Sequence, residues 1–198
     1  MIRTPQALVP YAFALAFLAA GALWHLAGEA GPARVRVTGV ANVGGPFALL
    51  DQDGETRTDA DFRGRWMLIY FGYTHCPDVC PTTLSLMSEV LNRLGKRAER
   101  LAPIFITVDP ERDTPEILKA YLASFDPRFI GLTGPASHVA SAAANYRVYV
   151  GRHLLPGGGY SVDHSSVIYL MNPAGKFAAD YDESEGPDAI AQDIAKRL

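Results

Sequence analysis

The first thirty residues differ from the rest of the chain in their pattern of apolar and polar positions. Residues 4–28 contain no Asp, Glu, Lys or Arg. The apolar run at residues 7–27 has the length of roughly 20 residues that a helix needs to cross a bilayer. We therefore expect an N-terminal segment at residues 1–6, a transmembrane anchor at residues 7–27 and a linker at residues 28–40. A cleaved signal peptide is the alternative, although apolar residues continue beyond the small-residue triplet at residues 20–22.

Residues 41–198 show a pattern of alternating strands and helices. A continuous apolar run at residues 66–73 is typical of a strand that is buried on both faces, and residues 103–109 indicate a second buried strand. The Asp53-Gly54 pair predicts a hairpin turn between two short strands. Apolar positions at helical spacing and helix-start signals define most of the other elements. We expect further strands at residues 129–133, 166–172 and 175–181, and helices at residues 82–101, 114–125, 136–146 and 186–198.

This order of elements predicts the fold class. Alternating strands and helices indicate a mostly parallel central sheet with helices on both faces, and the hairpin near the C-terminus adds antiparallel strands. We therefore predict an α/β protein whose residues 41–198 form a thioredoxin-like domain, with a central mixed sheet flanked by helices.

Charge excludes one class of partner. The 198 residues carry a formal net charge of -3 and no basic stripe, so nothing in the sequence indicates binding to nucleic acid.

Cys76 and Cys80 are the only cysteines, and they lie in a turn directly after the predicted strand at residues 66–73. Helical spacing would place their Cα atoms about 6 Å apart. This separation permits a disulfide and also permits chelation of a metal. We expect the start of the following helix to stabilise the thiolates. Two inert cysteines or a structural disulfide are less favoured, because α/β sheets place their functional sites at the carboxyl ends of central strands.

Two thiolates and one imidazole would suit copper, whereas structural zinc needs four ligands. His164 follows Asp163, whose carboxylate would orient the imidazole, although the residues alone leave open whether His164 is a ligand or a surface residue. The other four histidines have weaker claims: we expect a supporting role for His75, structural roles for His25 and His138, and an unconstrained position in a Gly-rich loop for His153.

Three sequence blocks together resemble the Sco/SenC family of membrane-anchored, thioredoxin-like copper proteins that help to assemble cytochrome c oxidase. The blocks are FGYTHCPDVCPTTL, TVDPERDTPEILKAY and YSVDHSSVIYLMNPAGKF, and the resemblance extends over residues 43–198. It implies that Cys76, Cys80 and His164 are the ligands of a copper ion, as Cu(I) or Cu(II). It also implies that Asp78 and Asp163 are acidic residues close to the site.

The resemblance further implies a metallochaperone rather than an enzyme. Its partners would be subunit II of cytochrome c oxidase, which receives copper at a dinuclear centre, a copper donor chaperone and a thiol reductant. The protein would span the bacterial cytoplasmic membrane once, with residues 1–6 in the cytoplasm and the C-terminal domain in the periplasm. The alternative function is a thiol–disulfide oxidoreductase whose redox-active pair, Cys76 and Cys80, reduces the cysteines of the oxidase. A thiol peroxidase fits least well.

Overall fold

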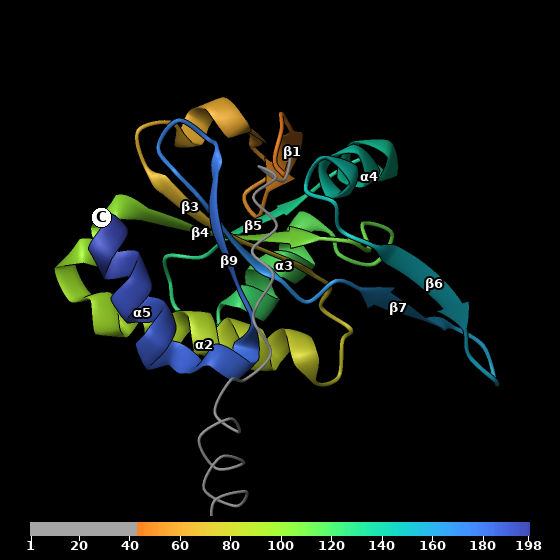
Figure 1. Ribbon diagram of the computed structural model, residues 1–198. Coiled ribbons are helices and arrows are strands. Elements are labelled where there is room, and N and C mark those ends of the chain that lie inside the picture. The colour runs from red at the N-terminus through yellow and green to blue at the C-terminus, as the bar shows by residue number, and fades with distance from the viewer. Residues whose placement is uncertain (1–42) are drawn as a thin grey trace, which may run out of the picture. The chain divides into compact units, whose positions relative to one another are not determined.

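A mixed sheet of seven strands forms the centre of the computed structural model, which describes residues 43–198 (Figure 1). The strands lie in the order β2-β1-β5-β4-β3-β8-β9. Their bounds are β1 (Ala48–Asp51), β2 (Thr56–Thr58), β3 (Trp66–Gly72), β4 (Leu101–Thr107), β5 (Ile130–Thr133), β8 (Ile168–Met171) and β9 (Phe177–Tyr181). The helices in these residues are α2 (Val79–Leu94), α3 (Pro115–Leu122), α4 (Ala136–Asn145) and α5 (Gly186–Arg197), with short 3-10 helices η1 (Asp59–Phe62), η2 (Gly95–Arg100) and η3 (Glu183–Glu185).

Strands β3, β4 and β5 pair in parallel, and the strands on either side of them pair antiparallel. The predicted mixed sheet is therefore confirmed, although its parallel part is limited to the three middle strands. Strand β4 is buried along its whole length and β3 along all but its first residue, because helices cover both faces of the sheet. Helices α2 and α5 pack together on one side, and α4 lies on the other side near β1 (Figure 1).

Helix α2 begins within the cysteine turn at Val79, and Gly95 follows its last residue. The expected helix at residues 82–101 is too long at its C-terminal end, because Gly95 adopts a positive φ of 54° and α2 stops at Leu94. The next six residues form η2, and β4 already begins at Leu101. The turn at Asp53-Gly54 is present as predicted, with the Gly54 N–H donating to the Asp51 carbonyl at 3.0 Å.

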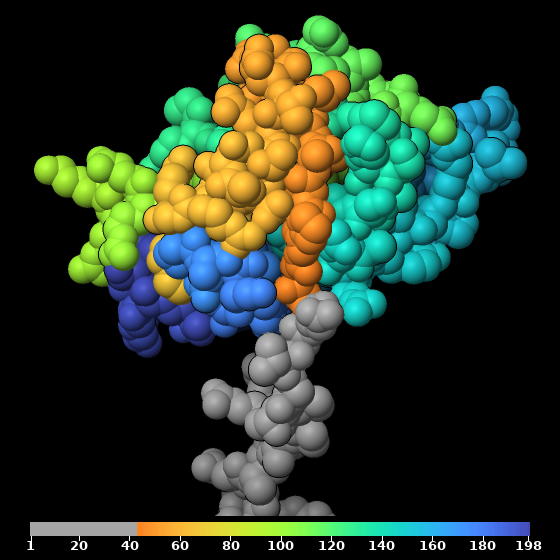
Figure 2. Space-filling view, turned by 90° about the horizontal axis from the view of Figure 1, so that it is seen from above, coloured from red at the N-terminus to blue at the C-terminus, as the bar shows by residue number. Residues whose placement is uncertain are grey.

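A second, two-stranded sheet was not expected from the sequence. Strands β6 (Val150–Leu154) and β7 (Tyr160–His164) pair only with each other and form a hairpin that projects from the body of the domain (Figures 1 and 2). Of their ten residues only Val162 is buried, so the hairpin lacks the apolar pattern of a core strand. The Gly-rich stretch at residues 157–159 forms the turn of this hairpin, whereas His153, which was expected in the loop, lies in β6.

No helix within residues 43–198 is long and apolar enough to cross a membrane. The predicted anchor at residues 7–27 and His25 lie outside the residues that the structure describes.

Candidate metal centre

Cys76, Cys80 and His164 converge at one end of the sheet. Strand β3 ends at Gly72, the cysteine turn follows, and Cys80 lies in the first turn of α2. His164 is the last residue of β7 and reaches the same place from the projecting hairpin. The two sulfur atoms and a ring nitrogen all lie within 4.8 Å of one another. The Cys80 Sγ and His164 Nε2 atoms are 3.3 Å apart.

The backbone of the turn holds the two sulfurs close together. The Cys76 N–H donates to the Tyr73 carbonyl at 3.3 Å, and the Cys80 N–H donates to the Cys76 sulfur at 3.4 Å. Gly72 makes room for the second sulfur, because a Cβ atom at this position would lie 2.9 Å from Cys80 Sγ. Cys76 precedes α2 rather than sharing a helical turn with Cys80. Both cysteines are free thiols.

The His164 ring is held in one orientation and one tautomer. The rings of Tyr70 and Tyr73 meet it edge-on at centroid distances of 6.1 and 5.9 Å. Its Nδ1 lies 3.1 Å from the Ser165 carbonyl oxygen. A carbonyl can only accept, so Nδ1 carries the proton and the Nε2 lone pair faces Cys80. Burial lowers the pKa of His164 and so favours this neutral form.

Burial also determines the protonation of the inner cysteine. Cys80 is completely buried, and desolvation raises its pKa to about 12. The expectation that the helix start stabilises both thiolates is therefore wrong for Cys80, because the loss of hydration outweighs the helix end. The helix start does supply one N–H to the Cys76 sulfur. In the metal-free site the Cys80 thiol is thus placed to donate to the Nε2 lone pair of His164.

This donor set fits a soft metal ion. Two sulfurs and one imidazole nitrogen match the preference of copper, and within residues 43–198 no other group of three or more such side chains is gathered closely enough to hold a metal. Cys76 is only half-buried, so the site is reachable from solvent. The same pair of sulfurs also has the arrangement needed for disulfide exchange, with one accessible and one buried thiol.

Asp163 and Asp78 were expected to be acidic residues close to the site, and the structure places them in different surroundings. Asp163 was expected to orient the His164 ring, but its carboxylate pairs with His153 Nε2 at 2.9 Å. The physical reason is the alternation of a strand: neighbouring residues of β7 point to opposite faces, so Asp163 points away from His164. Gly151, the residue paired with Asp163, has no side chain, and the carboxylate reaches the diagonal neighbour His153, which is paired with Ser161. Asp78 is exposed, and although it occupies the N-cap position of α2, its side chain makes no capping hydrogen bond.

The remaining histidines within the described part of the chain are not part of the cluster. His75 is half exposed, with Nδ1 at 3.1 Å from Thr74 Oγ1 and 3.9 Å from Asp113 Oδ1. His138, in α4, lies with Nδ1 3.2 Å from the Ala48 carbonyl oxygen.

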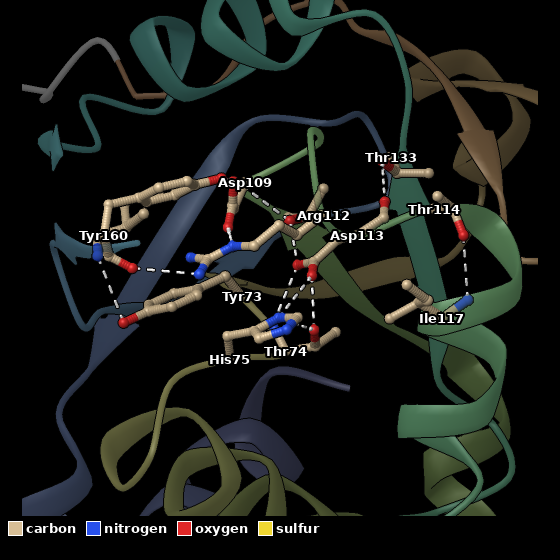
Figure 3. Close-up of polar contacts among 12 residues, drawn as sticks. Tyr73, Thr74, His75, Asp109, Arg112, Asp113, Thr114, Ile117, Thr133 and Tyr160 are labelled. Carbon is tan, nitrogen blue, oxygen red and sulfur yellow. Dashed lines mark hydrogen bonds and ion pairs between the residues drawn. The ribbon is translucent and has the colours of Figure 1, made fainter. Parts of the chain in front are cut away.

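Several residues that shape the site were not identified from the sequence. The buried carboxylate of Asp113 accepts from the Thr74 N–H at 3.0 Å and from its hydroxyl at 2.6 Å, which holds the cysteine turn (Figure 3). Tyr70 also contacts Cys80, with its hydroxyl 3.8 Å from the sulfur. The available signals were a tyrosine at each end of the Phe71-Gly72 pair and an aspartate between a buried strand and a helix, which are too general to assign a role.

Comparison with known proteins identifies relatives over most of the chain. A protein-family model described as SCO1/SenC matches residues 35–198. The mouse (Mus musculus) protein SCO2 homolog, mitochondrial, is 44% identical over 157 residues, which are 78% of this chain and 62% of the relative. The human (Homo sapiens) protein SCO1 homolog, mitochondrial, is 41% identical over 172 residues, which are 83% of this chain and 56% of the relative. The chain thus spans less than two thirds of the length of either relative.

Solved structures agree with these matches. The ScoI protein of Bradyrhizobium japonicum, solved with copper bound, is 47% identical, with a TM-score of 0.75 over 79% of this chain and 99% of that one. BsSco, described as a member of the Sco family of cytochrome c oxidase assembly proteins with a disulfide switch, is 29% identical, with a TM-score of 0.64 over 81% of this chain and 96% of that one. The chain belongs to the SCO1/SenC family.

Proposed function

We propose that this protein binds one copper ion through Cys76, Cys80 and His164 and delivers it during assembly of cytochrome c oxidase. The observation that carries the proposal is the convergence of two sulfurs and an unprotonated imidazole nitrogen within 4.8 Å. The copper-bound ScoI relative and the description of BsSco as an oxidase assembly protein support the cargo and the destination.

The two sulfurs and the imidazole suit the two oxidation states of copper differently. Two thiolates suffice to hold Cu(I) in a linear arrangement, whereas Cu(II) favours an additional nitrogen donor. His164 supplies that nitrogen without first losing a proton. We propose that the acceptor is subunit II of the oxidase and that a donor chaperone supplies the copper. A thiol reductant is also required, because a disulfide between Cys76 and Cys80 would block loading.

The alternative function uses the same sulfurs without the metal. A thiol–disulfide oxidoreductase would attack with the half-buried Cys76 and resolve with Cys80, and the disulfide switch named for BsSco favours keeping this candidate. Such chemistry needs no imidazole ligand, so His164 separates the two functions.

The first prediction concerns the sulfurs. The purified protein should bind one copper ion, and Cys76→Ser or Cys80→Ser should abolish stable binding, because each change leaves two donors and removes a soft one. Metal analysis after gel filtration measures the stoichiometry. Tight, stoichiometric copper in either variant would refute the assignment of both sulfurs.

The second prediction concerns His164→Ala. Cu(II) binding should weaken sharply and Cu(I) binding much less. Reduction of a test disulfide should be largely retained, because the accessible Cys76 sulfur keeps its hydrogen bond from the Cys80 N–H, although Cys80 loses its contact with the imidazole. His153→Ala is the matched control, since this histidine lies on the same hairpin outside the cluster. Oxidase assembly in cells decides between the functions: its loss supports copper delivery, and normal assembly with impaired copper binding supports the oxidoreductase.

The third prediction concerns pH. Because the pKa of Cys80 is raised to about 12, this thiol is protonated at neutral pH and must lose its proton when copper binds. Copper affinity should therefore rise with pH, by roughly tenfold per unit for each proton released. Proton release can be counted in weakly buffered solution at pH 7. Copper binding that releases no proton would contradict the buried, protonated thiol.

The fourth prediction concerns location. We propose that residues 7–27 anchor the protein in the bacterial cytoplasmic membrane and that the domain faces the periplasm, although the mouse and human relatives are named as mitochondrial. Protease added to intact spheroplasts should digest the domain but not a cytoplasmic marker protein. Full protection of the domain would overturn this orientation.

A further inference from the structure

The hairpin that carries His164 has few attachments to the body of the domain. Strands β6 and β7 pair only with each other, so no ladder of the central sheet fixes the position of the imidazole. One buried contact joins β7 directly to the cysteine side, where the Val162 N–H lies 3.5 Å from the Tyr73 hydroxyl. Tyr70, Tyr73 and Ser165 orient the His164 ring, so the position of the strand that carries it depends on the contacts between the hairpin and the domain body.

Arg112, between β4 and α3, makes both a ring contact and a hydrogen bond to the hairpin. Its guanidinium lies between the rings of Tyr73 and Tyr160, with Cζ 5.7 and 3.9 Å from the two centroids (Figure 3). Its Nη1 donates to the Tyr160 carbonyl at 3.2 Å, and its Nε donates to the buried Asp109. Tyr160 also belongs to this hydrogen-bond network, because its hydroxyl donates to the other Asp109 oxygen at 2.7 Å.

A second guanidinium group, that of Arg152, also packs against the Tyr160 ring. Arg152 of β6 lies with Cζ 3.7 Å from the centroid of the Tyr160 ring. Two guanidinium groups this close to one centroid must occupy opposite faces of the ring, so Tyr160 is enclosed between them. Arg152 is the more exposed of the two and pairs with Glu111. Arg112 is three-quarters buried, where a cation over an aromatic ring is stabilised more strongly than at the surface.

Asp113, the residue after Arg112, holds the segment that precedes Cys76. Asp113 is fully buried and accepts both hydrogen bonds from Thr74, two residues before Cys76. A third hydrogen bond comes from the Thr107 hydroxyl at 2.6 Å, and the Asp113 carbonyl accepts from Thr133 at 2.7 Å. Adjacent residues of one loop thus bind the segment before Cys76 and the strand that ends at His164.

We propose that Arg112 is a positioning residue of the metal centre, which sets the distance of the His164 imidazole from the two sulfurs. It acts through Tyr160, four residues before His164, and through Tyr73, whose ring packs against the imidazole. This role needs an arginine, because the planar guanidinium group stacks on aromatic rings and donates hydrogen bonds in its own plane at the same time. The part of the inference that involves copper rests on the proposed function, and the part that involves the hairpin does not.

The test compares Arg112→Ala with Arg112→Lys and with Arg128→Ala in the full chain. Arg128 is the matched control, since it also pairs with a mostly buried carboxylate, but its guanidinium donates to Asp126 and not to the hairpin. In the metal-free protein, Arg112→Ala should accelerate amide hydrogen exchange in residues 150–164 selectively. Arg112→Lys should lie between Arg112→Ala and the unmodified protein, and Arg128→Ala should not change exchange in the hairpin.

In the copper-loaded protein, Arg112→Ala should weaken Cu(II) binding by roughly 10- to 100-fold, as loss of an outer partner of a ligand does. Cu(I) affinity should change less, and the sulfur-to-Cu(II) absorption band should shift. Unchanged hairpin exchange together with unchanged Cu(II) affinity would overturn the proposal, as would exchange that accelerates evenly over the whole domain. If the unmodified protein binds no copper, the proposed function fails, while the exchange measurements still decide the role of Arg112.

Discussion

The contact between the Cys80 sulfur and the His164 ring joins two segments that are 84 residues apart. Each segment reaches the contact by a different route. The sulfur is fixed by the core, at the start of a helix that follows a strand buried along all but its first residue, and Gly72 leaves the space that the sulfur occupies. The imidazole is carried on a hairpin outside the central sheet. The loop between β4 and α3 contacts both segments, through Asp113 on the cysteine side and Arg112 on the hairpin side.

Burial gives this contact its chemical character. Desolvation raises the pKa of Cys80 and lowers that of His164, so it favours the neutral form of both groups. The neutral thiol and the neutral imidazole then form a complementary pair, with a sulfur-bound proton facing a nitrogen lone pair. A metal ion that enters must replace this proton. Loading of a metal ion would therefore be coupled to pH.

The candidate ligands are carried by parts of the domain that differ in how firmly they are packed, and this difference has a physical consequence. A core strand and helix are costly to displace, whereas a hairpin outside the central sheet, held mainly by side-chain contacts, opens at a lower free energy. The three donors therefore differ in how easily they can leave a bound ion. A site of this kind would retain Cu(I) on its sulfurs while the nitrogen donor moves, which is consistent with the copper delivery proposed above.

The sequence by itself determined the class of fold and the sulfur half of the site. Long apolar runs and a turn at Asp53-Gly54 specify strands and a hairpin locally, and two cysteines in one turn are close whatever the rest of the chain does. The nitrogen half, the partner of Asp163 and the protonation of Cys80 were decided only by the tertiary structure. Their cause is non-local: the exposed hairpin has no core pattern, strand pairing turns Asp163 toward His153, and desolvation depends on everything packed around the sulfur.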